Sequence, residues 1–105
     1  MNVQEKYKRL EDTVRAYNPS ANFDLIHRAF TFAEEAHRGQ NRKDGSPFIT
    51  HPLAVAQIVA EELRLDSESI EAALLHDVIE DTDLTLDDLA REGFDEDILT
   101  ALSLL

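Results

Sequence analysis

The fold is decided by the stretch Ala72-Ala73-Leu74-Leu75-His76-Asp77-Val78-Ile79-Glu80-Asp81, which sets a histidine and three carboxylates among apolar residues. Its apolar residues predict a buried helix. Isolated buried charge is costly unless a partner compensates it. Residues four apart share one face of a helix, so His76 lies with Glu80 and Asp77 lies with Asp81. We therefore predict a polar corner directed into the core, and a bound divalent metal ion would explain it.

The composition of the whole chain predicts a single all-α domain over residues 1–105. A chain of 105 residues is long enough for one hydrophobic core. Glycine and proline are scarce, with three of each, which disfavours a β-rich or disordered chain. Helical periodicity and turn signals then divide the domain into a helical bundle of about six helices.

Three helices are predicted in the first two thirds of the chain. An apolar stripe predicts an N-terminal helix within residues 1–20: Val3, Tyr7, Leu10, Val14 and Tyr17. Asn22 can cap a second helix, which would end near Gly39; its inner face would hold Ile26, Ala29, Phe30, Ala33 and Ala36 or His37. Thr50 or His51 would cap a third helix with Pro52 in its first position; its inner face would hold Val55, Ile58, Val59 and Leu63.

Three more helices follow. Asp66 or Ser67 would cap the fourth helix, which carries the polar corner, and Thr85 to Asp88 resembles a capping box that starts a fifth. Gly93 would end the fifth helix, and a sixth begins near Asp95 with Ile98, Leu99, Leu102 and Leu105 on one face. No C-terminal signal follows this face. We therefore expect a truncated domain whose apolar 98–105 helix self-associates into a homo-oligomer.

Composition and charge exclude several classes of protein. The chain has no cysteine, so it has no disulfides or thiolate metal sites. No apolar run is long enough to cross a bilayer, and residues 1–6 lack a hydrophobic signal region, so we expect a cytoplasmic protein without a membrane partner. Residues 1–60 carry 8 basic and 7 acidic side chains, whereas residues 61–105 carry 2 and 15. Such acidity disfavours nucleic-acid binding. The acidic residues of 83–97 either form a solvated face or attract a cation.

Two groups of residues are candidates for chemistry. Histidine nitrogen and carboxylate oxygen without thiolate suit a hydrolytic Mn, Fe, Zn or Mg centre, and His51, His76 and Asp77 supply them. Each is ambiguous alone, because His51 could simply be a polar cap and a His-Asp pair is common in helices. The basic cluster Arg38, Arg42 and Lys43 lies at the polar connection of residues 39–50. It suits phosphate and a purine ring, or forms a solvated loop.

Two stretches closely resemble the HD hydrolase domain of the RelA/SpoT family, over about residues 22–105. They are Ala36-His37-Arg38-Gly39-Gln40-Asn41-Arg42-Lys43-Asp44-Gly45-Ser46-Pro47-Phe48-Ile49-Thr50-His51-Pro52 and Ala72-Ala73-Leu74-Leu75-His76-Asp77-Val78-Ile79-Glu80-Asp81-Thr82. The resemblance implies an all-helical HD-domain fold, of which this chain is the N-terminal part. It also implies hydrolysis of the 3′-pyrophosphate of (p)ppGpp, the alarmone of the stringent response, normally with Mn²⁺.

The resemblance also assigns roles to individual residues. His51, His76 and Asp77 match three metal ligands of the family, and Glu80 and Asp81 match its pair that activates and orients water. The family's fourth ligand is an aspartate on a later helix, beyond the end of this chain, as are an asparagine and a threonine that help to bind the nucleotide. The fourth ligand's position is matched by none of Asp83, Asp87, Asp88, Asp95 and Asp97.

Within residues 39–50, which match the family's nucleotide-binding loop, Arg42 matches the arginine that packs on guanine, and Lys43 lies beside it. Asp44 stands where a serine is common, and Ser46 where a glutamate is common. Two other functions stay open: a catalytically incomplete HD fragment that serves as a regulatory or interaction module, and an HD phosphohydrolase for another nucleotide.

Overall fold

The computed structural model describes residues 1–103. Within this range the chain forms six α-helices: α1 (Val3–Tyr17), α2 (Phe23–Ala36), α3 (Thr50–Ile58), α4 (Ser67–Asp81), α5 (Leu86–Arg91) and α6 (Glu96–Ser103). A short π-helical turn, η1 (Val59–Leu63), continues α3. The described residues contain no strand, only an isolated bridge between Asn41 and Pro47. The predicted all-α architecture is confirmed.

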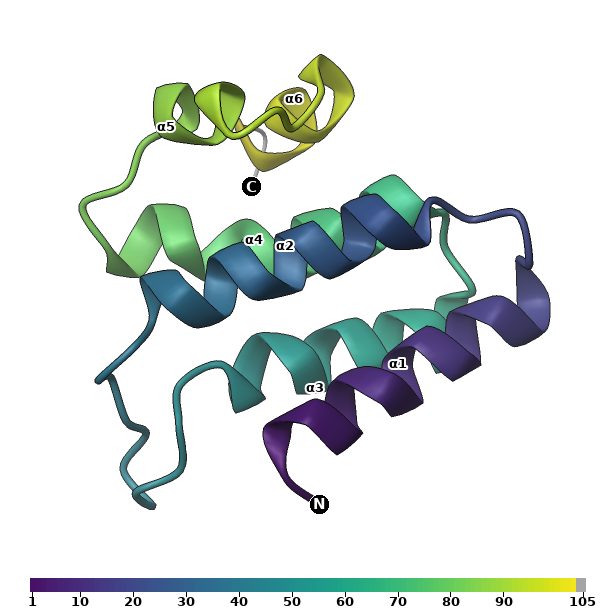
Figure 1. Cartoon of the computed structure of the whole chain (residues 1–105), viewed down its shortest axis with the longest axis horizontal. Coiled ribbons are helices and arrows are strands. Elements are labelled where there is room, and N and C mark those ends of the chain that lie inside the picture. Colours follow the sequence, from purple (N-terminus) through teal and green to yellow (C-terminus); the bar gives the residue numbers. More distant parts are fainter. Residues whose placement is uncertain (104–105) are drawn as a thin grey trace.

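The four longer helices form two layers, which α5 and α6 cover on one side (Figure 1). Helices α2 and α4 lie side by side and run in the same direction. The Asn22 amide donates to Ser67 Oγ at one end (3.3 Å), and the Gln40 side chain donates to the Asp81 carbonyl at the other (3.4 Å). Helices α1 and α3 form the second layer. This arrangement brings the C-terminal ends of α2 and α4 to the same end of the bundle.

Helix α4 lies at the centre and packs against α2, α3 and α6. Burial against three neighbours explains why its sequence is so apolar, because few of its faces can reach water. Four of its apolar side chains are fully buried: Ile70, Leu74, Leu75 and Val78. The predicted buried helix is confirmed for these residues.

Most helix starts follow from local sequence, as predicted. The side chains of Asn22 and Asp66 accept hydrogen bonds from Leu25 N (3.1 Å) and Ser69 N (2.9 Å). Thr85 forms a complete capping box with Asp88. The backbone and hydroxyl of Thr85 both donate to the Asp88 carboxylate, and these bonds lower the pKa of Asp88.

Replacing Thr85 with alanine removes this cap. We expect a loss of about 1 kcal/mol in the free energy of unfolding, because an N-cap hydroxyl satisfies an amide that otherwise lacks a helical partner. Urea denaturation measures the loss. Thr100→Ala, an exposed position within α6, is the control and should change stability by less than about 0.5 kcal/mol. Equal losses in the two variants would contradict the capping role.

The predicted start of α3 is wrong. Ile49 occupies the cap position without a side-chain hydrogen bond, and Thr50 is already helical, so Pro52 is the third helical residue. The chain enters this helix through a tight turn, in which the amide and hydroxyl of Thr50 both donate to the Pro47 carbonyl at 3.1 and 2.7 Å. The turn satisfies the amides that a side-chain cap would otherwise bond.

The predicted inner face of α3 and η1 is also largely wrong. Val55, Ile58 and Leu63 are 38%, 59% and 62% exposed, while Val59 is partly buried. The buried residues are Pro52, Leu53, Ala56 and Ala60. Because this segment is apolar nearly all round, its periodicity does not define one inner face. Packing against α1 and α4 selects the face with the smaller side chains.

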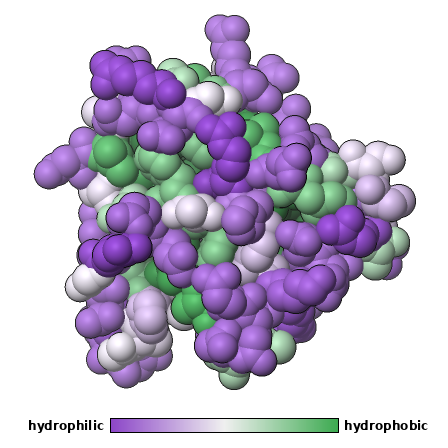
Figure 2. All heavy atoms as spheres, in the orientation of Figure 1, coloured by the Kyte–Doolittle hydropathy of each residue, from purple (hydrophilic) through white to green (hydrophobic). Residues whose placement is uncertain are grey.

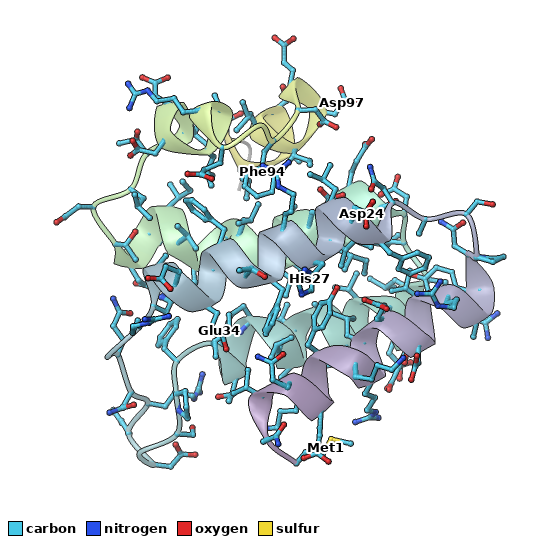
Figure 3. The ribbon with its side chains drawn as sticks, viewed as in Figure 1. Met1, Asp24, His27, Glu34, Phe94 and Asp97 are labelled. Carbon is cyan, nitrogen blue, oxygen red and sulfur yellow. The ribbon has the colours of Figure 1, made fainter. Side chains whose placement is uncertain are left out.

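Helix α6 and the connection before it close the core from above. Ile98 is fully buried and Leu102 is 6% exposed, so these two residues of the helix expected to self-associate pack within the chain itself; Leu105 lies outside the described residues. Phe94 points toward α2 in Figure 3, and its ring centroid lies 5.9 Å from that of Phe32 in an edge-on contact. Arg28 of α2 donates to the Glu92 carbonyl and lies over the Phe94 ring.

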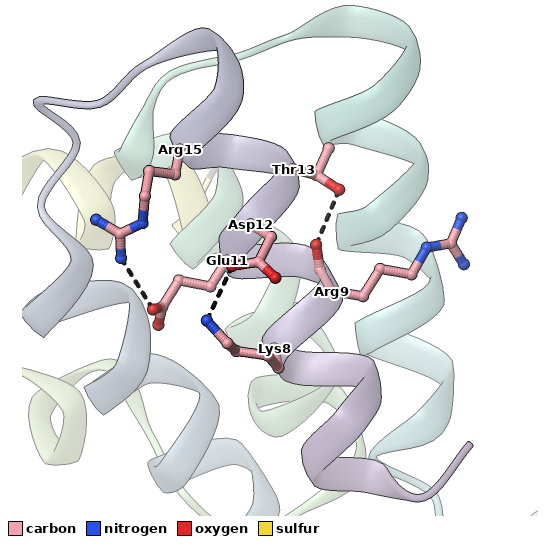
Figure 4. A network of polar contacts seen from close by, with 6 residues as sticks. All are labelled: Lys8, Arg9, Glu11, Asp12, Thr13 and Arg15. Carbon is pink, nitrogen blue, oxygen red and sulfur yellow. Dashed lines mark hydrogen bonds and ion pairs between the residues drawn. The ribbon is translucent and has the colours of Figure 1, made fainter.

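Hydrophilic side chains cover most of the face seen in Figure 2, and hydrophobic atoms show mainly in the recesses between helices. On α1, Lys8 pairs with Asp12 and Arg15 with Glu11, both at 3.0 Å (Figure 4). Such exposed pairs contribute little to stability. No helix in the described range is both long and apolar enough to span a membrane.

Candidate functional site

Three side chains from two helices meet where the start of α3 crosses the second half of α4. His51 lies in the first turn of α3, and His76 and Asp77 lie on α4. The two oxygens of Asp77 each approach one histidine. Oδ2 lies 3.4 Å from His51 Nε2, and Oδ1 lies 3.6 Å from His76 Nδ1. The structure thus brings together the three residues predicted as metal ligands, although His51 and His76 are 25 residues apart in the sequence.

Glu80 extends this group by one helical turn. Its Oε1 lies 3.3 Å from His76 Nε2, as expected for residues four apart on one face. Ligand atoms of His76, Asp77 and Glu80 all lie within 4.8 Å of one another. Imidazole nitrogen and carboxylate oxygen in this proximity suit a divalent metal ion. The side chains therefore fit such an ion, with His51 reaching the same carboxylate from the other helix.

The polar corner does not point into the core, contrary to the prediction. The side chains of His76 and Glu80 are 37% and 57% exposed, and that of Asp77 is 13% exposed. Tertiary packing explains the difference, because the apolar faces of α4 are used against α2, α3 and α6. The remaining edge faces the surface beside His51, where a ligand can reach it.

Two cavities meet at this corner and share His51 and Asp77. One, of about 620 Å³, is lined mainly by polar and charged residues of both signs: Asn41, Arg42, Lys43, Asp44, Phe48, His51, Asp77 and Asp81. The other, of about 360 Å³, is lined mainly by small or apolar residues: His51, Val55, Ser69, Ala72, Ala73, His76, Asp77 and Ala101. The first cavity places two basic side chains and two of the candidate metal ligands, His51 and Asp77, around one space.

The loop that carries Arg42 and Lys43 has a defined shape. The Arg42 amide donates to the Ser46 carbonyl at 2.8 Å, and Gly45 takes a positive φ of 88° at the tip. The Asp44 carboxylate accepts hydrogen bonds from the hydroxyl and amide of Ser46, and these bonds lower its pKa. The two residues that depart from the family pattern therefore close the loop by bonding each other.

The basic cluster divides into two parts. Arg42 and Lys43 line the polar cavity. Arg38 instead pairs with Glu35 on the exposed end of α2 and does not line this cavity. The cavity wall also includes Asp81, the last residue of α4. Five of the seven predicted site residues thus line this cavity, His76 lines the neighbouring one, and Glu80 lies beside His76.

Sequence reasoning missed the most unusual carboxylate of the chain. Glu71 is fully buried on α4, and neither of its oxygens has a hydrogen-bond partner among the described residues. Burial, together with the carboxylates of Asp95, Glu68 and Asp66, raises its pKa to about 8. Glu71 precedes Leu74, Leu75 and Val78 at helical spacing, which places it on the buried side of the helix. This spacing is the sequence signal that could have identified Glu71 as a buried carboxylate.

Three further residues connect the loop to the site and were not predicted to do so. Gln40 bonds with His37 and with the Asp81 carbonyl, and Phe48 packs between the rings of His37 and His51. Only His37 carried a sequence signal, as a possible inner-face residue of the second helix. The contact of Gln40 with Asp81 spans 41 residues of sequence and has no local signature.

Comparison with known proteins supports the resemblance drawn from the two sequence stretches. The guanosine-3′,5′-bis(diphosphate) 3′-pyrophosphohydrolase of Vibrio cholerae is 46% identical over 83 residues, which are 79% of this chain and 12% of that protein. The bifunctional (p)ppGpp synthase/hydrolase SpoT of Escherichia coli is 46% identical over 85 residues, 81% of this chain and 12% of that protein.

A probable GTP pyrophosphokinase of Mycobacterium leprae is 49% identical over 82 residues, 78% of this chain and 10% of that protein. The chain thus spans only 10 to 12% of the length of these curated relatives. The model of the HD domain family matches residues 29–102, which include His51, His76 and Asp77. The chain belongs to the HD domain family.

Proposed function

We propose that this chain forms part of a metal-dependent hydrolase that removes the 3′-pyrophosphate of guanosine tetra- or pentaphosphate, and so takes part in turnover of the stringent-response alarmone. The observation that carries the proposal is the polar cavity, in which Arg42 and Lys43 share one space with His51 and Asp77. Support also comes from the two relatives named for (p)ppGpp hydrolysis.

In this proposal His51, His76 and Asp77 hold the metal ion, for which we propose Mn²⁺. Such an ion, when bound, supplies Lewis-acid activation of phosphate and of water. Asp77 orients both histidines, because each of its oxygens faces one imidazole. His51 and His76 must present neutral nitrogens to bind a metal, so acid should weaken metal binding.

Glu80 and Asp81 are proposed to act on the attacking water. Glu80 is exposed and lies next to His76, where its carboxylate can accept a proton from water as a general base. Asp81 ends α4 at the wall of the polar cavity, where it can orient that water by accepting a second hydrogen bond.

Arg42 and Lys43 are proposed to bind the nucleotide. Both line the polar cavity, where cationic side chains bind diphosphates and the flat guanidinium can stack on guanine. Their position on a loop next to the metal corner would place the phosphates between the basic side chains and Asp77.

Arg42→Ala should raise the KM for ppGpp by about ten- to a hundredfold, because hydrogen bonds to charged groups contribute about 1.5–3 kcal/mol. Steady-state kinetics on the protein that contains this chain measure the change. Arg38→Ala is the matched control, since Arg38 is exposed, pairs with Glu35 and does not line the cavity. An equal rise in KM for both variants would show a general charge effect and contradict specific binding by Arg42.

The proposed reaction is tested by its products. The protein that contains this chain is incubated with ppGpp, with and without Mn²⁺, and with GTP and GDP as competing substrates. We expect Mn²⁺-dependent release of pyrophosphate and GDP from ppGpp. Preferential hydrolysis of another nucleotide would favour a different HD phosphohydrolase. Binding of Mn²⁺ and ppGpp without hydrolysis would favour a regulatory module.

A cytoplasmic location is part of the proposal, because guanosine polyphosphates are intracellular nucleotides. Self-association through residues 98–105 is not part of the proposal, because Ile98 and Leu102 are buried against the rest of the chain.

A further inference from the structure

Gln40 holds together three parts of the fold at the end of the bundle where the loop lies (Figure 1). Its side-chain Nε2 donates to the Asp81 carbonyl at the end of α4 (3.4 Å), and its Oε1 lies 3.1 Å from His37 Nδ1 at the end of α2. Its backbone carbonyl accepts a hydrogen bond from the Phe48 amide at 2.9 Å. One residue thus links the ends of two helices to the returning half of the loop.

The orientation of this amide determines which nitrogen of His37 donates to it. Because Nε2 of Gln40 donates to Asp81, its oxygen must accept, so His37 carries its proton on Nδ1. His37 is only 2% exposed, and its Nε2 has no hydrogen-bond partner within residues 1–103. The contact with Gln40 thus selects the tautomer of His37 in which Nδ1 donates.

The contacts continue from His37 to the metal corner through aromatic rings. The His37 and Phe48 ring centroids are 4.6 Å apart, and those of Phe48 and His51 are 6.0 Å apart. Gln40 also lies two residues before Arg42 in the chain. The side-chain amide of Gln40 thus contacts the backbone of Asp81 and the His37 ring that packs on Phe48. The backbone carbonyl of the same residue bonds the Phe48 amide at the base of the loop.

We propose that Gln40 and His37 act as positioning residues that set the basic loop relative to the metal corner. This inference rests on the proposed function and names the residues that give the polar cavity its affinity for a polyphosphorylated nucleotide. Neither residue is among the candidate metal ligands. Loss of the contact should therefore weaken nucleotide binding, while metal binding stays the same.

Gln57 offers a matched control. It is also a glutamine whose side chain joins two elements, donating to Thr13 (2.8 Å) and Glu61 (2.7 Å) between α1, α3 and η1. It does not line the polar cavity. Gln57→Leu therefore removes a comparable pair of hydrogen bonds at a distance from the polar cavity. It shows how far a loss of structural hydrogen bonds alone changes nucleotide binding.

Gln40→Leu should weaken ppGpp binding by about tenfold, as expected for loss of a hydrogen-bonded support. Calorimetric titration of ppGpp with chelator present measures binding without hydrolysis, and a separate Mn²⁺ titration should give unchanged affinity. In kinetics, KM should rise about tenfold with kcat changed less than about twofold. Gln57→Leu should change none of these quantities, even if its stability falls as much as that of Gln40→Leu.

The ¹⁵N chemical shifts of the two His37 ring nitrogens show which of them carries the proton. A general loss of stability does not change this measurement in the folded protein. The wild type should show a proton held on Nδ1, Gln40→Leu should lose this preference, and Gln40→Glu should keep the Nδ1 proton because a carboxylate oxygen still accepts from His37. Gln40→Glu should nevertheless weaken ppGpp binding, since it cannot donate to the Asp81 carbonyl.

The failures are distinguishable. A wild-type protein that neither binds nor hydrolyses ppGpp contradicts the proposed function, and the inference with it. A wild type that binds ppGpp, with Gln40→Leu and Gln57→Leu equal in nucleotide affinity, contradicts the inference alone.

Discussion

Asp77→Ala should abolish measurable Mn²⁺ binding and lower ppGpp hydrolysis by at least about a hundredfold. Within residues 1–103, Asp77 is the carboxylate that faces both histidines, with oxygens 3.4 Å from His51 Nε2 and 3.6 Å from His76 Nδ1. Its removal takes away one candidate ligand and leaves both imidazoles without the group that orients them. Even residues that only support metal ligands cost about ten- to a hundredfold when mutated. Calorimetry with Mn²⁺ and a pyrophosphate-release assay measure the two effects.

Asp87→Ala is the control for this experiment. Asp87 is exposed on α5 and lies outside the candidate metal group. Its replacement by alanine removes the same charge from the acidic half of the chain as Asp77→Ala does. It should leave Mn²⁺ affinity and hydrolysis within about twofold of the wild type. Equal losses in Asp77→Ala and Asp87→Ala would mean that the general acidic field, rather than the corner, attracts the metal.

Glu71→Gln should make the protein more stable above neutral pH and flatten its pH dependence. The pKa of Glu71 in the folded chain is raised to about 8, from an ordinary value of 4.5, because the carboxyl is buried and has acidic neighbours. The folded state therefore keeps a proton that the unfolded chain releases. The stability linked to this proton is complete below pH 4.5, falls as pH rises, and is lost above about pH 8.

The expected size follows from the shift in pKa. Each unit corresponds to 1.36 kcal/mol, so the wild type should lose several kcal/mol relative to Glu71→Gln between pH 4.5 and 8. Urea denaturation of both proteins from pH 5 to pH 9 measures the difference. Carboxyl groups with lowered pKa values, such as Asp44 and Asp88, finish titrating below this window. Parallel stability curves would show that Glu71 is not a buried acid.

Features set by neighbouring residues could be predicted from the sequence. Asn22, Asp66 and Thr85 cap their helices as expected because each bonds an amide three residues away. His76 and Glu80 meet because they are one helical turn apart. Local geometry alone determines these contacts.

Features set by packing could not be predicted in this way. The exposed face of α3 depended on which of several apolar faces its neighbours cover, and the exposure of His76 depended on where α4 contacts other helices. The approach of Arg42 to Asp77 was implied only by family resemblance, since no spacing relates a loop to a helix so far along the chain. The bond from Gln40 to Asp81 had no sequence signal.

The most direct test of the metal centre is a crystal of this protein grown with Mn²⁺, with anomalous diffraction used to locate the ion. We predict one strong peak in the space bounded by His51, His76 and Asp77, and its absence from crystals of Asp77→Ala. No peak at that corner, or peaks only beside the exposed acidic residues of α5 and α6, would contradict the account.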